Sequence, residues 1–223
     1  KAANIPTSWQ PFSFPVKYSE FSGGFLLLLS NYLLKEIFGK RKGGDFLTTG
    51  ILLYPRFSEY ELSVIISVLT QANHPKIFIG LKNEPIKGEA GLICLPEMTI
   101  DEVNPNLIQS LVMPGVDDFQ HLMEEEALFE FIRQVYENDG IIGAISSAPF
   151  LLAKAGILLD RYYTTGISRQ AREFLGVFSE KRFVDAPLVC DRGIITAKGA
   201  YFTDFAIKFG QVLGLDFNQN WYR

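Results

Sequence analysis

The chain is poor in the residue types that build disulfide frameworks and metal centres. Its 223 residues include only two cysteines, Cys94 and Cys190, and two histidines, His74 and His121. The cysteines fall in different predicted segments and no Cys-x-x-Cys pair occurs, which favours a reducing compartment, the cytoplasm, with both thiols buried and structural. Because metal-ligand spacing is absent as well, we expect no metal site and no cofactor.

The chain also lacks an excess of positive charge and a long apolar run. A formal charge of -4 gives no electrostatic support for a nucleic-acid partner. The apolar stretch over 25–34 is interrupted by Ser30-Asn31-Tyr32 and is too short to span a bilayer. It also has no small-residue cleavage site typical of a signal peptide. We therefore expect no membrane partner and predict an amphipathic helix over about 23–38.

Short apolar runs alternate with helical patterns from residue 47 onward. This alternation predicts an α/β fold, a flavodoxin-like three-layer sandwich whose mostly parallel sheet has helices on both faces. We assign residues 1–46 to an N-terminal extension and 47–223 to one α/β domain. The strands are predicted at 49–54, 76–80, 108–113, 141–145 and 193–197, with an antiparallel excursion within 81–103. The helices are predicted at 58–73, 124–138, 149–155 with Gly156 as its cap, about 168–175 and 201–213.

The turn Ala144-Ile145-Ser146-Ser147-Ala148 lies between a predicted buried strand and a helix that opens at Pro149. A serine between small residues at this position is the layout of a nucleophile elbow, with alanines where hydrolases usually carry glycines. Such a turn holds its apical side chain, here that of Ser146, over a cleft. Glu61 and Gly115-Val116 follow other strands at the same edge of the sheet, where α/β proteins bind ligands.

Glu61 has two interpretations. Ser58 and Glu61 fit a capping box, in which the glutamate bonds back to the start of the helix. Alternatively, the carboxyl group faces the cleft and contacts Ser146, and burial beside apolar walls then raises its pKa.

Several features together resemble the ThiJ/PfpI family of the class I glutamine-amidotransferase-like superfamily. They are Glu61 on the first helix, Val112-Met113-Pro114-Gly115, the elbow continuing through Leu151–Leu158, Thr164-Thr165, and Gly193–Gly199 before the last helix. The resemblance runs from about Gly50 to Gly214. It implies a homodimer and a site in which Ser146 replaces the family's elbow cysteine beside Glu61. It also implies an oxyanion hole after Gly115, formed by the backbone N–H groups of Val116 and Ser147.

The departures from this family bear on chemistry. An alcohol needs a general base where a thiol does not, and no histidine follows Ser146. Peptidase-like relatives place a histidine directly after the nucleophile, where this chain has Ser147. His121 is a candidate base near the cleft, or else a solvated or capping residue. Asp117 and Asp118 add negative charge that disfavours an anionic intermediate.

Two hypotheses of different classes follow, with a third beside them. The favoured one is a family member without thiol chemistry, which binds a small molecule or has a stress-related or regulatory role as a homodimer. The alternative is a serine-dependent hydrolase or amidase, with Ser146 as nucleophile assisted by Glu61 or His121. The third applies if the natural residue 146 is cysteine: the protein is then a glyoxalase-, deglycase- or peptidase-like enzyme.

Overall fold

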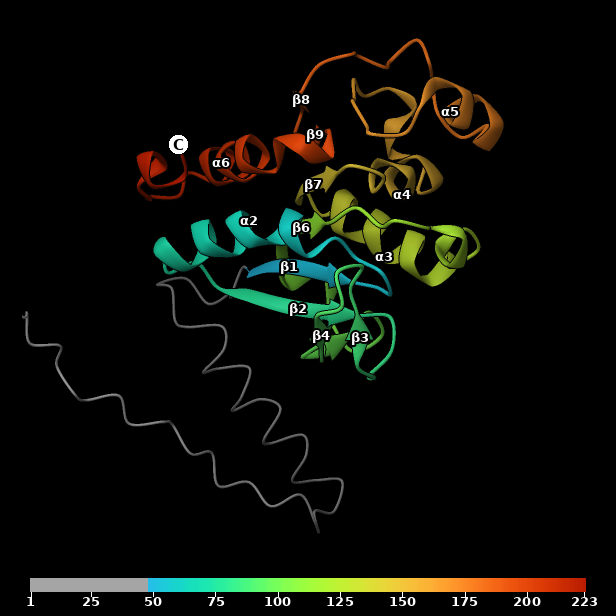
Figure 1. Cartoon of the computed structure of the whole chain (residues 1–223). Coiled ribbons are helices and arrows are strands. Elements are labelled where there is room, and N and C mark those ends of the chain that lie inside the picture. Colours follow the sequence, from blue (N-terminus) through green and yellow to red (C-terminus); the bar gives the residue numbers. More distant parts are fainter. Residues whose placement is uncertain (1–47) are drawn as a thin grey trace, which may run out of the picture. The chain divides into compact units, whose positions relative to one another are not determined.

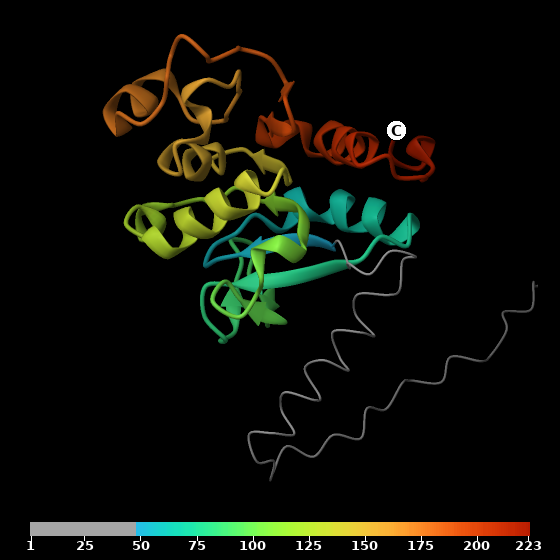
Figure 2. The ribbon, with the colours of Figure 1, turned by 180° about the vertical axis from the view of Figure 1, so that it is seen from behind.

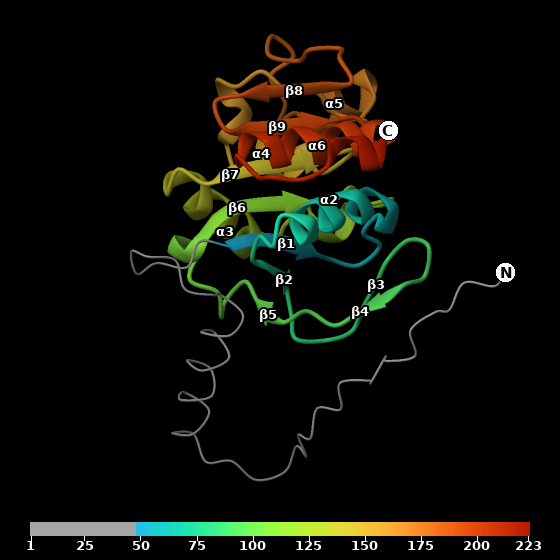
Figure 3. The same ribbon diagram turned by 90° about the vertical axis from the view of Figure 1, so that its left-hand side faces the viewer.

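A seven-stranded sheet forms the centre of the protein. The structure, a computed structural model, describes residues 48–223, so the extension over 1–46 and its predicted helix lie outside the described residues. The strand order is β5-β2-β1-β6-β7-β9-β8, and every neighbouring pair is parallel except β8 with β9 (Figure 3). The strands are β1 (Thr48–Leu53), β2 (Lys76–Gly80), β5 (Met98–Thr99), β6 (Ile108–Met113), β7 (Ile141–Ile145), β8 (Leu188–Asp191) and β9 (Ile194–Ala197).

Helices cover both faces of this sheet, which confirms the predicted flavodoxin-like α/β sandwich. One face carries α2 (Glu59–Gln71) and α6 (Phe202–Val212), which pack on each other (Figure 1). The other face carries α3 (Glu126–Glu137) and α4 (Pro149–Lys154), seen from behind in Figure 2. A short helix, α5 (Arg169–Leu175), follows α4 in the chain. No helix within residues 48–223 is long and apolar enough to cross a membrane.

Close packing of α6 on the sheet depends on one small residue of β7. A Cβ atom at Gly143 would lie 2.7 Å from Phe205 Cζ and 2.8 Å from Phe209 Cδ2. Both phenylalanines belong to α6 and are fully buried. Because side chains in a protein core fill space at crystal-like density, the missing side chain of Gly143 leaves the room that these rings occupy.

The predicted elements agree with the structure best where strands are buried. The bounds of β2, β6 and β7 are those predicted, and the excursion within 81–103 contains the antiparallel pair β3 (Ile86–Lys87) and β4 (Ile93–Cys94). Gly156 follows α4 in the left-handed conformation expected of a helix stop, with φ 80°. Two strands, β5 and β8, were not predicted.

The turn before β9 explains why β8 was missed. Arg192 and Gly193 have φ values of 48° and 83° and form a two-residue turn, so Gly193, the first residue of the strand predicted at 193–197, lies outside β9. The turn pairs β9 with β8, a half-exposed edge strand without apolar alternation.

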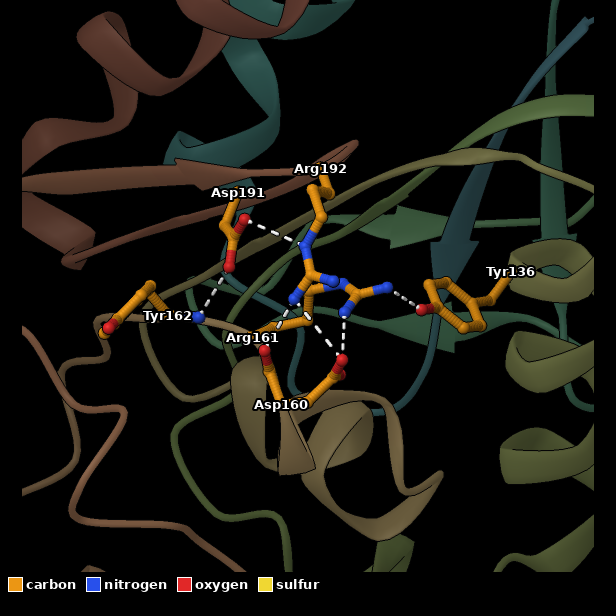
Figure 4. Close-up of polar contacts among 6 residues, drawn as sticks. All are labelled: Tyr136, Asp160, Arg161, Tyr162, Asp191 and Arg192. Atoms are coloured by element: carbon orange, nitrogen blue, oxygen red, sulfur yellow. Dashed lines mark hydrogen bonds and ion pairs between the residues drawn. The ribbon is translucent and has the colours of Figure 1, made fainter.

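A polar network joins this turn to the segment that follows α4 (Figure 4). Arg192 donates to the backbone oxygen of Asp160 at 2.6 Å, and Asp160 also pairs with Arg161 at 2.6 Å. Arg161 in turn reaches the hydroxyl of Tyr136 on α3. Its side chain is only 12% exposed, so this arginine fixes the position of the segment more firmly than a surface ion pair does.

Candidate functional site

Ser146 lies directly after β7 in a strained conformation. Its φ of 61° is in the left-handed region, which residues other than glycine rarely adopt. The backbone is held on both sides: its amide donates to Ala197 O at 2.8 Å, and its carbonyl accepts from Gly166 N at 2.8 Å and Thr165 Oγ1 at 2.7 Å. The half-buried side chain is thereby presented at the sheet edge, as expected of a nucleophile elbow.

Glu61 turns its carboxyl group toward this elbow. The residue is 1% exposed, and its Oε2 accepts from Gly115 N at 2.6 Å. The Tyr60 hydroxyl donates to Oε1 at 3.2 Å, and the Ser146 side chain also hydrogen-bonds to the carboxyl group. Ser58 caps nothing with its side chain and instead donates to Glu89 Oε1 at 2.7 Å. The capping-box hypothesis is therefore wrong, and the contact between the carboxyl group and Ser146 that the alternative predicted is present.

Burial sets the protonation behaviour of Glu61. Removal from water raises the pKa of its carboxyl group, and the nearby charge of Glu89 acts in the same direction. The hydrogen bonds from Gly115, Tyr60 and Ser146 oppose that rise without cancelling it. The Tyr54 hydroxyl, which donates to Pro114 O close by, has a raised pKa because it is buried beside this carboxyl group.

Two glycines make room for the Glu61–Ser146 pair. A Cβ atom at Gly115 would lie 2.6 Å from Ser146 Cβ and 2.7 Å from Glu61 Oε2. At Gly199 it would lie 2.7 Å from Glu61 Oε1 and 3.1 Å from Ser146 Oγ. Gly199 was not predicted as a site residue, although it ends one of the segments that carried the family resemblance. The pair is thus enclosed by backbone from both sides.

The expected oxyanion hole has an occupant. The amide of Val116 donates to Ser147 Oγ at 2.9 Å, and the same hydroxyl donates back to Val116 O at 2.9 Å. Val116 also forms an isolated antiparallel bridge with Phe57. The side chain of Ser147 therefore takes up the amide that, by resemblance, was expected to stabilise a negative charge at the elbow.

His121 stands apart from the pair. It is exposed in a short 3-10 turn, and no hydrogen bond joins it to Ser146 or Glu61 in the described structure. Arg56, which was not predicted as a site residue, pairs with Asp117 at 2.6 Å and approaches Asp118 at 3.7 Å. This single cation, from the loop after β1, offsets one of the two negative charges that the aspartates contribute.

Neither cysteine behaves as predicted. Cys94 is half-buried on β4 and Cys190 is exposed on β8, so the expectation of two buried structural thiols is wrong. Both cysteines lie on short strands that have one face open to solvent. The sequence of so short a strand does not indicate which of its faces is exposed. Partial burial and the charge of Glu59 raise the pKa of the Cys94 thiol. Within residues 48–223 no group of histidine, cysteine and acidic side chains is arranged to hold a metal ion.

A cavity of about 500 Å³ lies beside the elbow. Thr165 and Gly166, which hold the Ser146 carbonyl, line it together with Lys198, the neighbour of Gly199. Arg172 closes another side, with its guanidinium group paired to Glu180 at 2.7 Å and stacked on the Phe183 ring at 3.7 Å. The segment that holds the Ser146 carbonyl thus lines a polar cavity large enough for a small metabolite, whereas Ser146 and Glu61 themselves do not line it.

Comparison with known proteins places this geometry in a family. Residues 49–211 match the model of the DJ-1/PfpI family. The chain is 27% identical over 169 residues to the glutathione-independent glyoxalase DJR-1.2 of Caenorhabditis elegans, covering 73% of this chain and 87% of that protein. It is 27% identical over 111 residues to the deglycase PfpI of Pyrococcus furiosus, covering 50% and 67%.

Solved structures share the fold at lower identity. A DJ-1 superfamily protein from Agrobacterium tumefaciens superposes with a TM-score of 0.68 at 22% identity, covering 78% of this chain and 93% of that one. A ThiJ/PfpI family protein from Bacillus anthracis superposes with a TM-score of 0.69 at 23% identity, covering 80% and 90%.

Proposed function

Because the chain belongs to the DJ-1/PfpI family, we propose that it binds a small molecule at the Glu61–Ser146 pair. In this proposal Ser146 stands where the family has its elbow cysteine and serves as a hydrogen-bonding group, so the protein performs no thiol chemistry. Ser146 is half-buried and Glu61 fully buried, which suits them to orient a ligand rather than to meet solvent.

The observation that carries this proposal is the bond between Ser147 Oγ and the amide of Val116, 2.9 Å long. Acyl transfer requires donors that point at the developing oxyanion, and loss of one such donor lowers turnover by about 10²–10³. With this amide engaged inside the protein, the elbow keeps its shape but lacks one of the two charge-stabilising donors expected for it. Binding without turnover fits that arrangement.

The ligand we propose is a small uncharged 1,2-dicarbonyl compound, the class that the name glyoxalase denotes for one relative, or a hydroxy carbonyl compound of similar size. The Ser146 hydroxyl donates or accepts a hydrogen bond, and the neighbouring carboxyl group does the same according to its protonation.

Calorimetric titration with hydroxyacetone, an uncharged hydroxy carbonyl compound, tests the proposal. We expect saturable binding by the full chain and a loss of about tenfold or more in affinity in Ser146→Ala and in Glu61→Gln. A parallel assay measures the conversion of methylglyoxal to lactate. We expect background rates for the natural chain and a gain in Ser146→Cys, whereas robust turnover by the unmodified protein would contradict the proposal.

A serine-dependent hydrolase or amidase is the second candidate. The left-handed φ of Ser146 and its hydrogen bond to Glu61 favour it, because a strained elbow with an adjacent carboxyl group is a means of activating an alcohol. Fluorophosphonate labelling separates the two candidates. Labelling that disappears in Ser146→Ala and increases in Ser147→Ala, where the Val116 amide is released, would establish the hydrolase instead.

A further inference from the structure

A cavity of about 850 Å³ lies beyond the carboxyl ends of β1, β2 and β5. It begins where these strands stop: Leu53 ends β1, Leu81 follows β2 and Ile100 follows β5. Neither Glu61 nor Ser146 lines it, so the proposed function leaves it unused. Its size and its place at the ends of parallel strands are those of ligand sites in α/β proteins.

The floor of this cavity is apolar. Leu53, Ile86 and Ile100 are 1%, 5% and 9% exposed, and Pro55 and Pro85 extend the same surface toward the rim. Binding of a ligand with an apolar body is therefore favoured by about 25 cal/mol for each Å² of apolar surface that it removes from water here.

The rim carries an excess of negative charge. Five carboxylates and three cationic side chains line the cavity, for a formal charge of -2. Arg56 is engaged by Asp117 at 2.6 Å, and Glu89 accepts a hydrogen bond from Ser58. The remaining lining charges are exposed and make no ion pair with another described residue: Glu84, Asp101 and Glu125 against Lys82 and Lys87.

The spacing of these carboxylates indicates the kind of cation. In the described part of the chain no three histidine, cysteine or acidic side chains converge on a point where a metal ion would be held. Carboxylates spread around an apolar floor match an organic cation whose charge lies at one end of an apolar body.

We propose that this cavity is a second binding site, which takes a small primary amine with an aromatic or alkyl body. The apolar part lies against Leu53, Ile86 and Ile100, and the ammonium group lies among the carboxylates of Glu84, Asp101 and Glu125. The Glu61–Ser146 pair takes no part in this binding.

Thermal shift and calorimetric titration of the full chain with 2-phenylethylamine, tryptamine and hexylamine test the site. The charge-reversed 3-phenylpropionate serves as the matched ligand at equal ionic strength. We expect saturable binding of at least one amine, with a rise in Tm of about 3 °C at ten times its Kd, and no rise with the carboxylate. Absence of saturable binding by all three amines, or equal binding of the carboxylate, would overturn the proposal.

Two variants locate the bound amine. Asp101→Asn combined with Glu125→Gln changes only exposed side chains and is expected to weaken amine binding about fivefold or more, whereas Ile100→Trp fills the cavity and is expected to abolish it. Ser146→Ala is the matched control and keeps full affinity for the amine. Amine binding that is lost in Ser146→Ala but retained in both cavity variants would place the ligand at the elbow and overturn the assignment.

Discussion

At the scale of single residues, the buried carboxyl group of Glu61 links the site to pH. Burial raises its pKa above the ordinary 4.5, so the folded protein holds this proton more tightly than the unfolded chain does. Stability from this group is therefore fully present below pH 4.5 and is lost as the pH rises through the raised pKa. A rise of one pH unit in this pKa corresponds to about 1.4 kcal/mol, or about 3–6 °C in Tm for a domain of this size.

Glu61→Gln removes the buried charge, so we expect the Tm of this variant to gain on that of the natural chain between pH 4 and pH 8. Melting curves followed by circular dichroism at intervals of one pH unit measure the difference. Glu137→Gln, at an exposed position near the end of α3, is the control and keeps a constant difference. A Glu61→Gln difference that stays level or falls with pH would show that burial does not govern this carboxyl group.

The two glycines around the pair lead to a second prediction. Gly115→Ala and Gly199→Ala introduce a methyl group within 2.6–2.7 Å of Ser146 or Glu61 atoms, which forces the pair apart. We expect both variants to lose about tenfold or more in affinity for hydroxyacetone by calorimetry. In Gly166→Ala the new methyl group lies 3.5 Å from the Ser146 backbone, an ordinary contact, and affinity stays within about twofold. Equal affinities in all three variants would contradict this account of the site.

At the scale of elements, the contact between β7 and α6 rests on Gly143. A methyl group there meets two phenylalanine rings of α6 at 2.7–2.9 Å, so we expect Gly143→Ala to destabilise the fold by about 1–3 kcal/mol. Chemical denaturation measures the change, again with Gly166→Ala as the control that stays near the natural value. An unchanged unfolding midpoint in Gly143→Ala would contradict this prediction, because it would mean that α6 moves to admit the methyl group without a loss of unfolding free energy.

Predictability from sequence also follows the elements. The bounds of β2, β6 and β7 are readable because buried parallel strands appear as continuous apolar runs. β8 has no such apolar run because it is a half-exposed edge strand that includes Cys190 and Asp191. Within the site, the nearness of Glu61 to Ser146 follows from strand order and family resemblance. The bond between Ser147 and Val116 depends on the exact path of the loop after β6, which residue types alone do not specify.

At the scale of the whole molecule, the ribbon of β3 and β4 bears on assembly. Leu92, Ile93 and Leu95 are 56–66% exposed, and β4 pairs only with β3 in the described part of the chain. Glu59 fixes this hairpin by accepting hydrogen bonds from the amides of Ala90 and Leu92. A rigid apolar surface beside an open strand edge is suited to another protein surface, and we propose that two copies of the chain meet there.

Light scattering coupled to size-exclusion chromatography tests this assembly. We expect a mass twice the 25.1 kDa of one chain. In Ile93→Glu we expect the single-chain mass, with a Tm that falls only by the stabilisation that the second copy provided. Phe174→Glu, at an 88% exposed position on α5, is the control and keeps the double mass. A single-chain mass for the natural protein, or an unaltered mass in Ile93→Glu, would overturn this surface.

The way the chain holds Ser146 has a consequence for how this fold changes over time. The hydrogen bonds from Gly166 and Thr165 and to Ala197 involve only the backbone of that residue. They hold it in its left-handed conformation. The side chain at this position is therefore interchangeable among small residues, because the turn does not depend on it for support. A single codon change at this position therefore exchanges the hydroxyl group for a thiol and leaves the backbone hydrogen bonds of the turn in place.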